Sequence, residues 1–169
     1  MLVLALAFVL ADAGAAQADV SMLPANLTPP SSSVQLFTVH AAGVQLYVCK
    51  ARADDPQNFA WTFTAPQATL MNAAGEQIGT HYAGPSWEGK DGSTVVGTVV
   101  ERADAPVPAA IPWLLLESKS HAGSGVFSTV TYIQRLETVG GVAPADGCNE
   151  ATANTERAVE YTATYAFFY

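Results

Sequence analysis

Apolar side chains recur at every second position along most of this 169-residue chain. The alternation is cleanest in "NFAWTFT" (58–64), where Phe59, Trp61 and Phe63 share one face and Ala and Thr occupy the other. Successive side chains of a strand point to opposite faces, so a period of two predicts β-strands. Trp61 lies in the middle of this strand and is expected in the core. No segment shows the 3.6-residue period of an amphipathic helix, so the prediction is an all-β fold.

The alternating segments are short and separated by Gly, Pro and Ser; they are 33–39, 44–50, 58–64, 68–72, 76–82, 93–102, 113–119, 126–138 and 158–169. Short loops that end in glycine, 40–43 and 73–75, predict hairpins. Gly97 predicts a bulge or a close approach of another group to the backbone. The polar segment 149–158 has room for one helical turn. These features predict an antiparallel β-sandwich or barrel of about eight to ten strands.

The N-terminal segment has the pattern of a secretory signal peptide. "LVLALAFVLA" is apolar, and Ala16-Gln17-Ala18 matches the small-x-small cleavage pattern, although no Lys or Arg precedes the apolar run. A membrane span needs about 20 apolar residues, and Asp12 interrupts the run too early for one. We therefore expect a signal peptide at 1–18, an extended proline-rich lead-in at 19–32 and one β domain at 33–169. The alternative is a buried N-terminal helix. Cleavage would leave a secreted or periplasmic protein with no membrane span.

Cys49 and Cys148 are the two cysteines of the chain. In an oxidising compartment an even number of cysteines predicts disulfides, here one. The bridge would close a loop of about 100 residues, which chain-entropy models value at roughly 4–5 kcal/mol. A pair of reactive thiols or metal ligands is the alternative, and the C-x-x-C spacing typical of both is absent.

The charge of the chain narrows its range of partners. Seven basic residues stand against 15 acidic ones, for a formal net charge of −8, and the basic residues form no cluster. Phosphate contacts supply most of the affinity for nucleic acids, so neither a nucleic acid nor an anionic membrane surface is expected as a partner.

The stretch "GTHYAGPSWEGKDGSTVVG" (79–97) concentrates groups that could bind a ligand. Its candidate residues are His81, Tyr82, Trp87, Glu88 and Asp91, and His121 is a candidate from outside the stretch. Aromatic rings next to polar groups in a glycine-rich loop are typical of sites for small molecules or glycans. Part of the stretch needs no function, because Asp-Gly at 91–92 also favours a tight turn. We predict a non-catalytic module that binds a small molecule, a glycan or a surface partner.

Two alternatives belong to other classes of function. His40, His81 and His121 all lie in or beside glycine-containing turns, and together they could form an open metal site in a metal-assisted enzyme. A structural envelope protein could instead associate through an exposed edge strand at 158–169. No Gly-x-Ser-x-Gly motif is present, so no catalytic residue is assigned, and no cofactor is predicted.

The longer motif string resembles a known family. "GVQLYVC", "FAWTFTAPQATLMNAAGEQIGTHYAGPSWEGKDGSTVVG", "IPWLLLESKSHAGSGVFSTVTYIQRLETVGGVAP", a closing Cys and "YTATYAFFY" are similar to the domain of unknown function 3455 family. That family occurs in secreted or periplasmic proteins of bacteria and in fungi. The resemblance covers nearly the whole chain after the signal peptide. It implies a single domain and a compartment, but no activity and no site residue.

Overall fold

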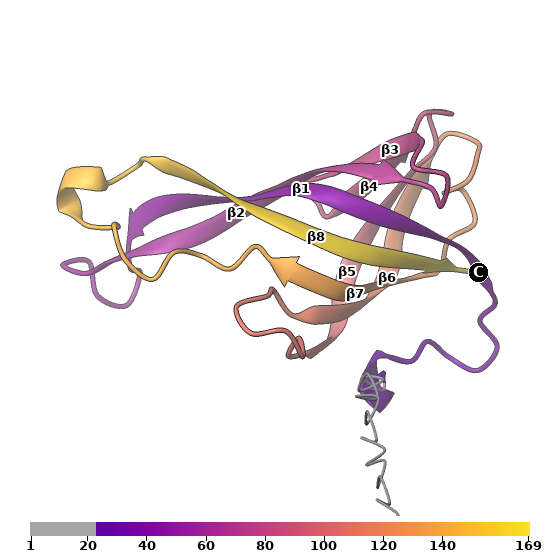
Figure 1. The fold of residues 1–169 in the computed structure, drawn as a ribbon, viewed down its shortest axis with the longest axis horizontal. Coiled ribbons are helices and arrows are strands. Elements are labelled where there is room, and N and C mark those ends of the chain that lie inside the picture. The colour runs from indigo at the N-terminus through magenta and orange to yellow at the C-terminus, as the bar shows by residue number, and fades with distance from the viewer. Residues whose placement is uncertain (1–22) are drawn as a thin grey trace, which may run out of the picture.

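The computed structural model describes residues 23–169, so the signal peptide predicted at 1–18 lies outside the described residues. The chain forms one antiparallel sheet of eight strands that closes into a barrel (Figure 1). Each strand pairs with the next along the chain, and β1 pairs with β8. The strands are β1 (Gln35–Ala51), β2 (Phe59–Met71), β3 (Gln77–Tyr82), β4 (Ser86–Gly89), β5 (Thr94–Ala103), β6 (Trp113–Ala122), β7 (Tyr132–Gly140) and β8 (Glu156–Phe168), with short 3₁₀ turns η1 (Ala25–Leu27) and η2 (Glu150–Thr152). The all-β prediction is confirmed, and the fold is a barrel, not a sandwich.

The hairpin predicted at 40–43 does not exist, because β1 continues through these residues without a break. Gly43 is needed there for a different reason. A Cβ atom at this position would collide with the backbone carbonyl of Gln67 on β2. The glycine therefore permits a close approach of two strands and does not make a turn. The second predicted hairpin, at 73–75, is confirmed as the β2–β3 turn.

The two segments predicted at 58–64 and 68–72 are likewise one strand, β2, with Pro66 inside it. A proline cannot donate a hydrogen bond to a neighbouring strand and is tolerated mainly at edges and bulges. Both conditions hold here. The β1–β2 register shifts just after Leu46, close to Pro66, and pairing with β3 begins only at Ala68.

The long strands β1, β2 and β8 run past the barrel and form an arm, which comprises residues 48–51, 59–62 and 156–157 (Figure 1). The predicted disulfide is confirmed at this end, where Cys49 on β1 is bonded to Cys148 in the segment that leads to η2. η2 is the helical turn expected within 149–158. The bridge therefore ties the arm to the connection between β7 and β8.

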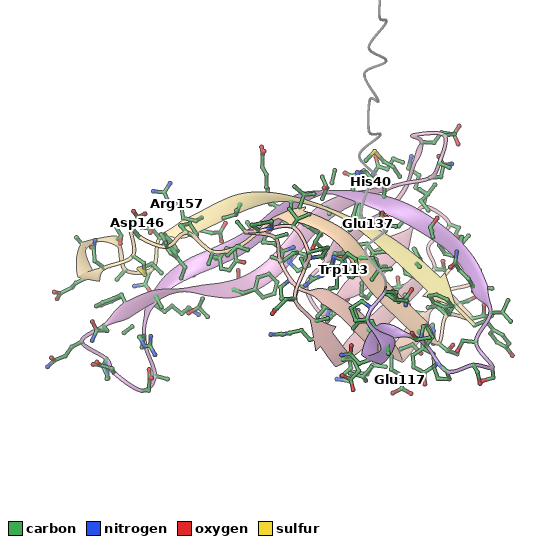
Figure 2. All side chains as sticks on the ribbon, turned by 60° about the horizontal axis from the view of Figure 1, so that its bottom comes forward. His40, Trp113, Glu117, Glu137, Asp146 and Arg157 are labelled. Carbon is green, nitrogen blue, oxygen red and sulfur yellow. A yellow bond between two sulfur atoms is a disulfide. The ribbon has the colours of Figure 1, made fainter. Side chains whose placement is uncertain are left out.

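Trp61 lies in the arm and not in the core as predicted. Its Nε1 donates a hydrogen bond to the carbonyl oxygen of Asp146 at 2.8 Å, and the guanidinium of Arg157 lies 5.9 Å from its ring centroid. Figure 2 shows Asp146 and Arg157 together at the far end of the arm. The period of two was right about the strand. It could not show that this part of the strand runs beyond the closed barrel.

One end of the barrel interior is filled by aromatic rings. Phe37, Phe127 and Phe167 are in mutual contact, with ring centroids 4.9–5.8 Å apart. Phe127 comes from the loop between β6 and β7 and is fully buried. The prediction of a strand over 126–138 was therefore wrong at its start, since β7 begins only at Tyr132 and the residues before it fold across the barrel end.

The outer face of the barrel carries a second, smaller apolar cluster. Leu27 of η1 packs against Trp113 and Leu115 of β6, and all three side chains are buried. The backbone carbonyl of Leu27 accepts a hydrogen bond from Gln134 Nε2 at 2.7 Å. Because neighbours along β6 point to opposite faces, Leu114 and Leu116 point inward instead.

The exposed edge strand predicted at 158–169 is absent. β8 pairs with β1 on one side and with β7 on the other. Its alternating aromatic residues, Tyr161, Tyr165 and Phe167, are buried in the barrel interior. Separately, the described residues contain no helix with the length and apolarity needed to cross a membrane.

Candidate functional site

The other half of the barrel interior is hollow and encloses a cavity of about 390 Å³. Strands from all around the barrel contribute to its wall, as do the β3–β4 turn and the loop between β5 and β6. The lining residues are Gln45, Tyr47, Phe63, Pro66, His81, Pro85, Trp87, Val99, Arg102, Ile111, Pro112, Leu114, Leu116, Arg135 and Tyr165. The wall is therefore mainly apolar and aromatic, with a few polar groups.

His81 and Trp87, two of the predicted site residues, lie together in this wall. They face each other across the β3–β4 hairpin, and their rings stack with centroids 4.5 Å apart and planes inclined at 16°. The ring of Tyr165 on β8 meets both at 5.1 and 5.4 Å. A glycine-rich loop was expected within 79–97, but Trp87 belongs to the short strand β4, and this strand directs its ring inward.

The imidazole of His81 is neutral and has a defined tautomer. Its Nδ1 lies 2.8 Å from the carbonyl oxygen of Ser86, which can only accept a hydrogen bond. Nδ1 therefore carries the proton, and Nε2 is left as an acceptor. Burial lowers the pKa of His81 to about 3, a shift that the hydrogen bond to Ser86 opposes and the charge of Arg135 adds to.

Three buried polar atoms of the cavity wall have no hydrogen-bond partner among residues 23–169. They are Nε2 of Gln45, Nε1 of Trp87 and the hydroxyl of Tyr165. An unpaired buried polar group costs about 1–3 kcal/mol, so such groups are rare without water or a ligand. By contrast, the neighbouring hydroxyl of Tyr47 is satisfied and donates to the carbonyl oxygen of Gly141 at 2.6 Å.

Two arginines line the cavity, Arg102 with an exposed side chain and Arg135 with a partly buried one. The Nε and one terminal nitrogen of Arg135 donate to the carbonyl oxygen of Pro112, at 3.1 and 2.8 Å. Burial raises the pKa of the Tyr165 hydroxyl, and the positive charge of Arg135 opposes that rise. The guanidinium thus lies close enough to the aromatic wall to influence its ionisation.

Sequence reasoning did not identify Gln45, Tyr47 or Arg135 as site residues. Each occupies an inward position of a strand, and an inward polar residue looks like an outward one until the strand's orientation is known. Arg135 follows Ile133 at the two-residue spacing of an inward face. That spacing could have indicated that Arg135 points to the same side of the strand as Ile133. Tyr165 was marked only as part of an aromatic C-terminal strand.

Tyr82 and Glu88 lie on the outside of the barrel. They follow His81 and Trp87 in sequence, so the alternation of strand side chains turns them away from the cavity. The Tyr82 hydroxyl donates to a carboxylate oxygen of Glu88 at 2.9 Å. This hydrogen bond raises the pKa of the Tyr82 hydroxyl. The structure therefore does not bring these two predicted residues to the cavity.

Asp91 and His121 hold the loop that closes the filled end. The Asp91 carboxylate accepts hydrogen bonds from the amide and hydroxyl of Ser93 and from the amide of Val126, at 2.6–2.9 Å. These contacts, with the Ser93 hydroxyl first, lower the pKa of Asp91. His121 Nε2 donates to the carbonyl oxygen of Val130 at 2.7 Å. Both side chains explain how Phe127 is held in place.

The histidines proposed as metal ligands lie in different environments. His40 is exposed on β1 (Figure 2), His81 is buried in the cavity wall, and His121 is bonded to the β6–β7 loop. In the part of the chain that the structure describes, no three His, Cys, Asp or Glu side chains are grouped so that they could hold a metal ion. The shared site suggested for His40, His81 and His121 is therefore not formed.

Comparison with known proteins gives one match, and it covers the whole barrel. A family model described as "Protein of unknown function (DUF3455)" matches residues 29–169. No curated protein is significantly similar to the chain, and neither is any solved structure. The match begins before β1 and ends at the last residue, so cavity, arm and closed end all fall within it. The chain belongs to the DUF3455 family.

Proposed function

We propose that this barrel is a non-catalytic module that binds one small, mainly apolar molecule in its interior cavity. The observation that carries the proposal is the hollow half of the barrel, whose volume of about 390 Å³ lies within the usual range of roughly 300–1,000 Å³ for ligand sites. Eight-stranded barrels are wide enough either to be filled by side chains or to hold one small ligand. Here one half is filled and the other is not.

The polar groups of the wall support the same proposal. Ligand sites combine an apolar lining with a few polar groups that orient the ligand. The unpaired atoms of Gln45, Trp87 and Tyr165 fit that description. They would cost stability in an empty cavity and would be satisfied by a ligand's polar atoms or by water.

A glycan or a protein partner fits the geometry less well. Stacking on sugar rings or partner surfaces needs exposed aromatic side chains, whereas Trp87 is 1 % exposed and its ring faces other rings inside the barrel. The strand proposed for association, β8, is paired on both sides. A small molecule inside the barrel uses the aromatic groups where they lie.

We also infer that the protein works in an oxidising compartment, outside the cell or in a periplasm. The Cys49–Cys148 disulfide supports this inference, because such bonds persist mainly in those compartments. The apolar segment at 1–18 supports it from the sequence.

The proposal is tested with phenylnaphthylamine, a neutral apolar dye that fluoresces when it leaves water. Titration should give a saturable signal with one site per chain. Leu114→Phe adds a ring on the inward face of β6 and should weaken binding at least tenfold. Leu115→Phe adds the same atoms on the outward face and is the matched control. Circular dichroism melts establish that both variants fold.

The two variants distinguish binding inside the barrel from binding elsewhere on the protein. Loss of dye binding in Leu114→Phe with retention in Leu115→Phe supports an interior site. Equal binding by both variants places the dye elsewhere and contradicts the proposal. Native mass spectrometry of protein purified from its own source adds an independent measurement. A co-purified small molecule should raise the mass of the wild type above that of the bare chain, and Leu114→Phe should lack this increase.

A further inference from the structure

Arg135 is an unusual residue to find in the wall of this cavity. It lies opposite Leu114 on β6 and Tyr165 on β8, and no carboxylate lies within ion-pair distance of it among the described residues. The lining contains no Asp or Glu at all. This is the reverse of the chain as a whole, which carries a net charge of −8.

Arg135 is partly buried in a mainly apolar wall, where hydrogen bonds or an opposite charge compensate the loss of water around a cation. The carbonyl oxygen of Pro112 accepts from Nε and one terminal nitrogen of Arg135. The guanidinium also lies beside the Tyr165 hydroxyl, and this contact opposes the rise in the pKa of that hydroxyl. No carboxylate of the described residues accepts from the guanidinium, so its planar fork of donors is only partly used.

The unpaired groups near Arg135 are suited to the same type of ligand atom. The indole N–H of Trp87 can only donate, and so can the side-chain amide nitrogen of Gln45. The Tyr165 hydroxyl can donate as well. Three neutral donors and two arginines, Arg135 on the inner wall and the exposed Arg102, therefore line a space without an acidic group. This arrangement favours an acceptor with negative charge.

We propose that the ligand of this barrel is an apolar carboxylate, whose anionic group is bound by Arg135 and whose hydrocarbon body lies against Trp87, Leu114 and Leu116. This inference rests on the proposed function and narrows it to a class of ligand. The rings of Trp87 and Tyr165 would contact the body of the ligand, and the amide of Gln45 or the Tyr165 hydroxyl would donate to the second carboxylate oxygen. A terminal nitrogen of Arg135 would donate to the first carboxylate oxygen.

The test compares naphthoic acid with naphthamide by isothermal titration calorimetry at neutral pH. The two molecules share size and ring system, and only the acid is charged. The wild type should bind the acid at least tenfold more tightly. Arg135→Gln should abolish that preference, and Arg135→Lys should keep part of it. Lys90→Gln removes a positive charge from an exposed side chain between β4 and β5, outside the cavity lining, and is the control.

The possible results distinguish failure of the carboxylate inference from failure of the proposed function. If the wild type binds acid and amide equally, the carboxylate inference is overturned, while the small-molecule function stands. If neither compound nor phenylnaphthylamine binds, the proposed function itself fails. If Lys90→Gln loses the preference as fully as Arg135→Gln, the preference does not depend on a contact with Arg135, and Arg135 is not the group that binds the anion. Arg135→Gln could fail to fold because the Pro112 contact is lost. In that case the ratio of the affinities for acid and amide, measured in the wild type and in Arg135→Lys, still tests the inference.

Discussion

The imidazole of His81 lies flat against the indole of Trp87, with 4.5 Å between ring centroids, and both rings are almost completely buried. The β3–β4 hairpin is what brings them together, because the tight turn pairs the two residues directly across the strands. The stack forms one wall of the cavity. The titratable ring of His81 thus lies in the barrel interior, although its position in the sequence resembles an exposed loop.

The burial of His81 predicts an acid-sensitive fold. Its pKa is about 3 in the folded chain and about 6.5 when unfolded, so below pH 6.5 the unfolded state takes up the proton and the folded state does not. The free energy of unfolding should therefore fall as the pH drops from 6.5 toward 3. His81→Gln should remove that part of the fall, which reaches about 3 kcal/mol two pH units below the unfolded pKa.

Urea denaturation between pH 4 and 8 measures this difference. Each variant is compared with its own stability at pH 8, because the substitution also removes a stacked ring. His40→Gln, on the exposed outer face, is the control for loss of a histidine. Parallel pH curves for wild type and His81→Gln would falsify the prediction.

Gly43 should tolerate no side chain. In Gly43→Ala, the added methyl group meets the backbone of β2 at Gln67 and Ala68, which cannot move without disturbing the sheet. We expect a loss of more than about 2 kcal/mol, at the upper end of overpacking effects. Gly75→Ala is the comparison, since nothing lies near that position and only its positive φ of 77° opposes alanine, a cost of about 1–2 kcal/mol. A smaller loss for Gly43→Ala than for Gly75→Ala, measured by urea unfolding, contradicts the close approach.

The disulfide should stabilise the arm without shaping the cavity. In the double variant Cys49→Ser and Cys148→Ser, the free energy of unfolding should fall by about 2–5 kcal/mol, because the unfolded chain loses a large closed loop. Hydrogen exchange should accelerate in the arm and in 141–155, while β3–β6 stay protected. Dye binding by the folded fraction should be unchanged. Faster exchange throughout the barrel would show that the bridge supports the whole fold.

The variant Asp91→Asn tests whether the Asp91 carboxylate stabilises the fold or binds the ligand. The carboxylate accepts hydrogen bonds from Ser93 and Val126, so the variant should melt at a lower temperature. Because these contacts lower the pKa of Asp91, their stabilisation is present above the unfolded pKa of about 3.8 and disappears as the pH falls through the folded value. Affinity for phenylnaphthylamine should not change. A variant that keeps its melting temperature and loses the dye would place Asp91 in the binding site.

Much of the fold could be predicted because alternation reports local strand geometry. It identified the fold class, and the glycines between the alternating segments identified the β2–β3 turn and the role of Gly97, whose Cβ position lies 3.1 Å from the Trp87 ring and where the β5–β6 register shifts. The disulfide followed from the presence of two cysteines. Alternation failed where long-range geometry decides. At 40–43 a glycine that permits a close approach of two strands looked like a turn, and in β2 a proline at a bulge looked like a break.

The candidate site was predictable in part for the same reason. His81 and Trp87 stood out because aromatic and imidazole rings near glycines are conspicuous, and the hairpin turned both inward. Tyr82 and Glu88 were their sequence neighbours, and alternation alone sends neighbours to opposite faces. Arg135 was missed because only closure of the sheet shows that its face of β7 is an interior.

The two ends of the barrel are closed to different extents. The β6–β7 loop covers one end with Phe127 and is held through Asp91, Ser93 and His121. The proposed ligand would therefore enter and leave at the opposite rim, which includes Pro85, Arg102 and Pro112. On this proposal the rim would govern the dissociation rate and the inner wall the equilibrium selectivity, so that substitutions could change the two separately.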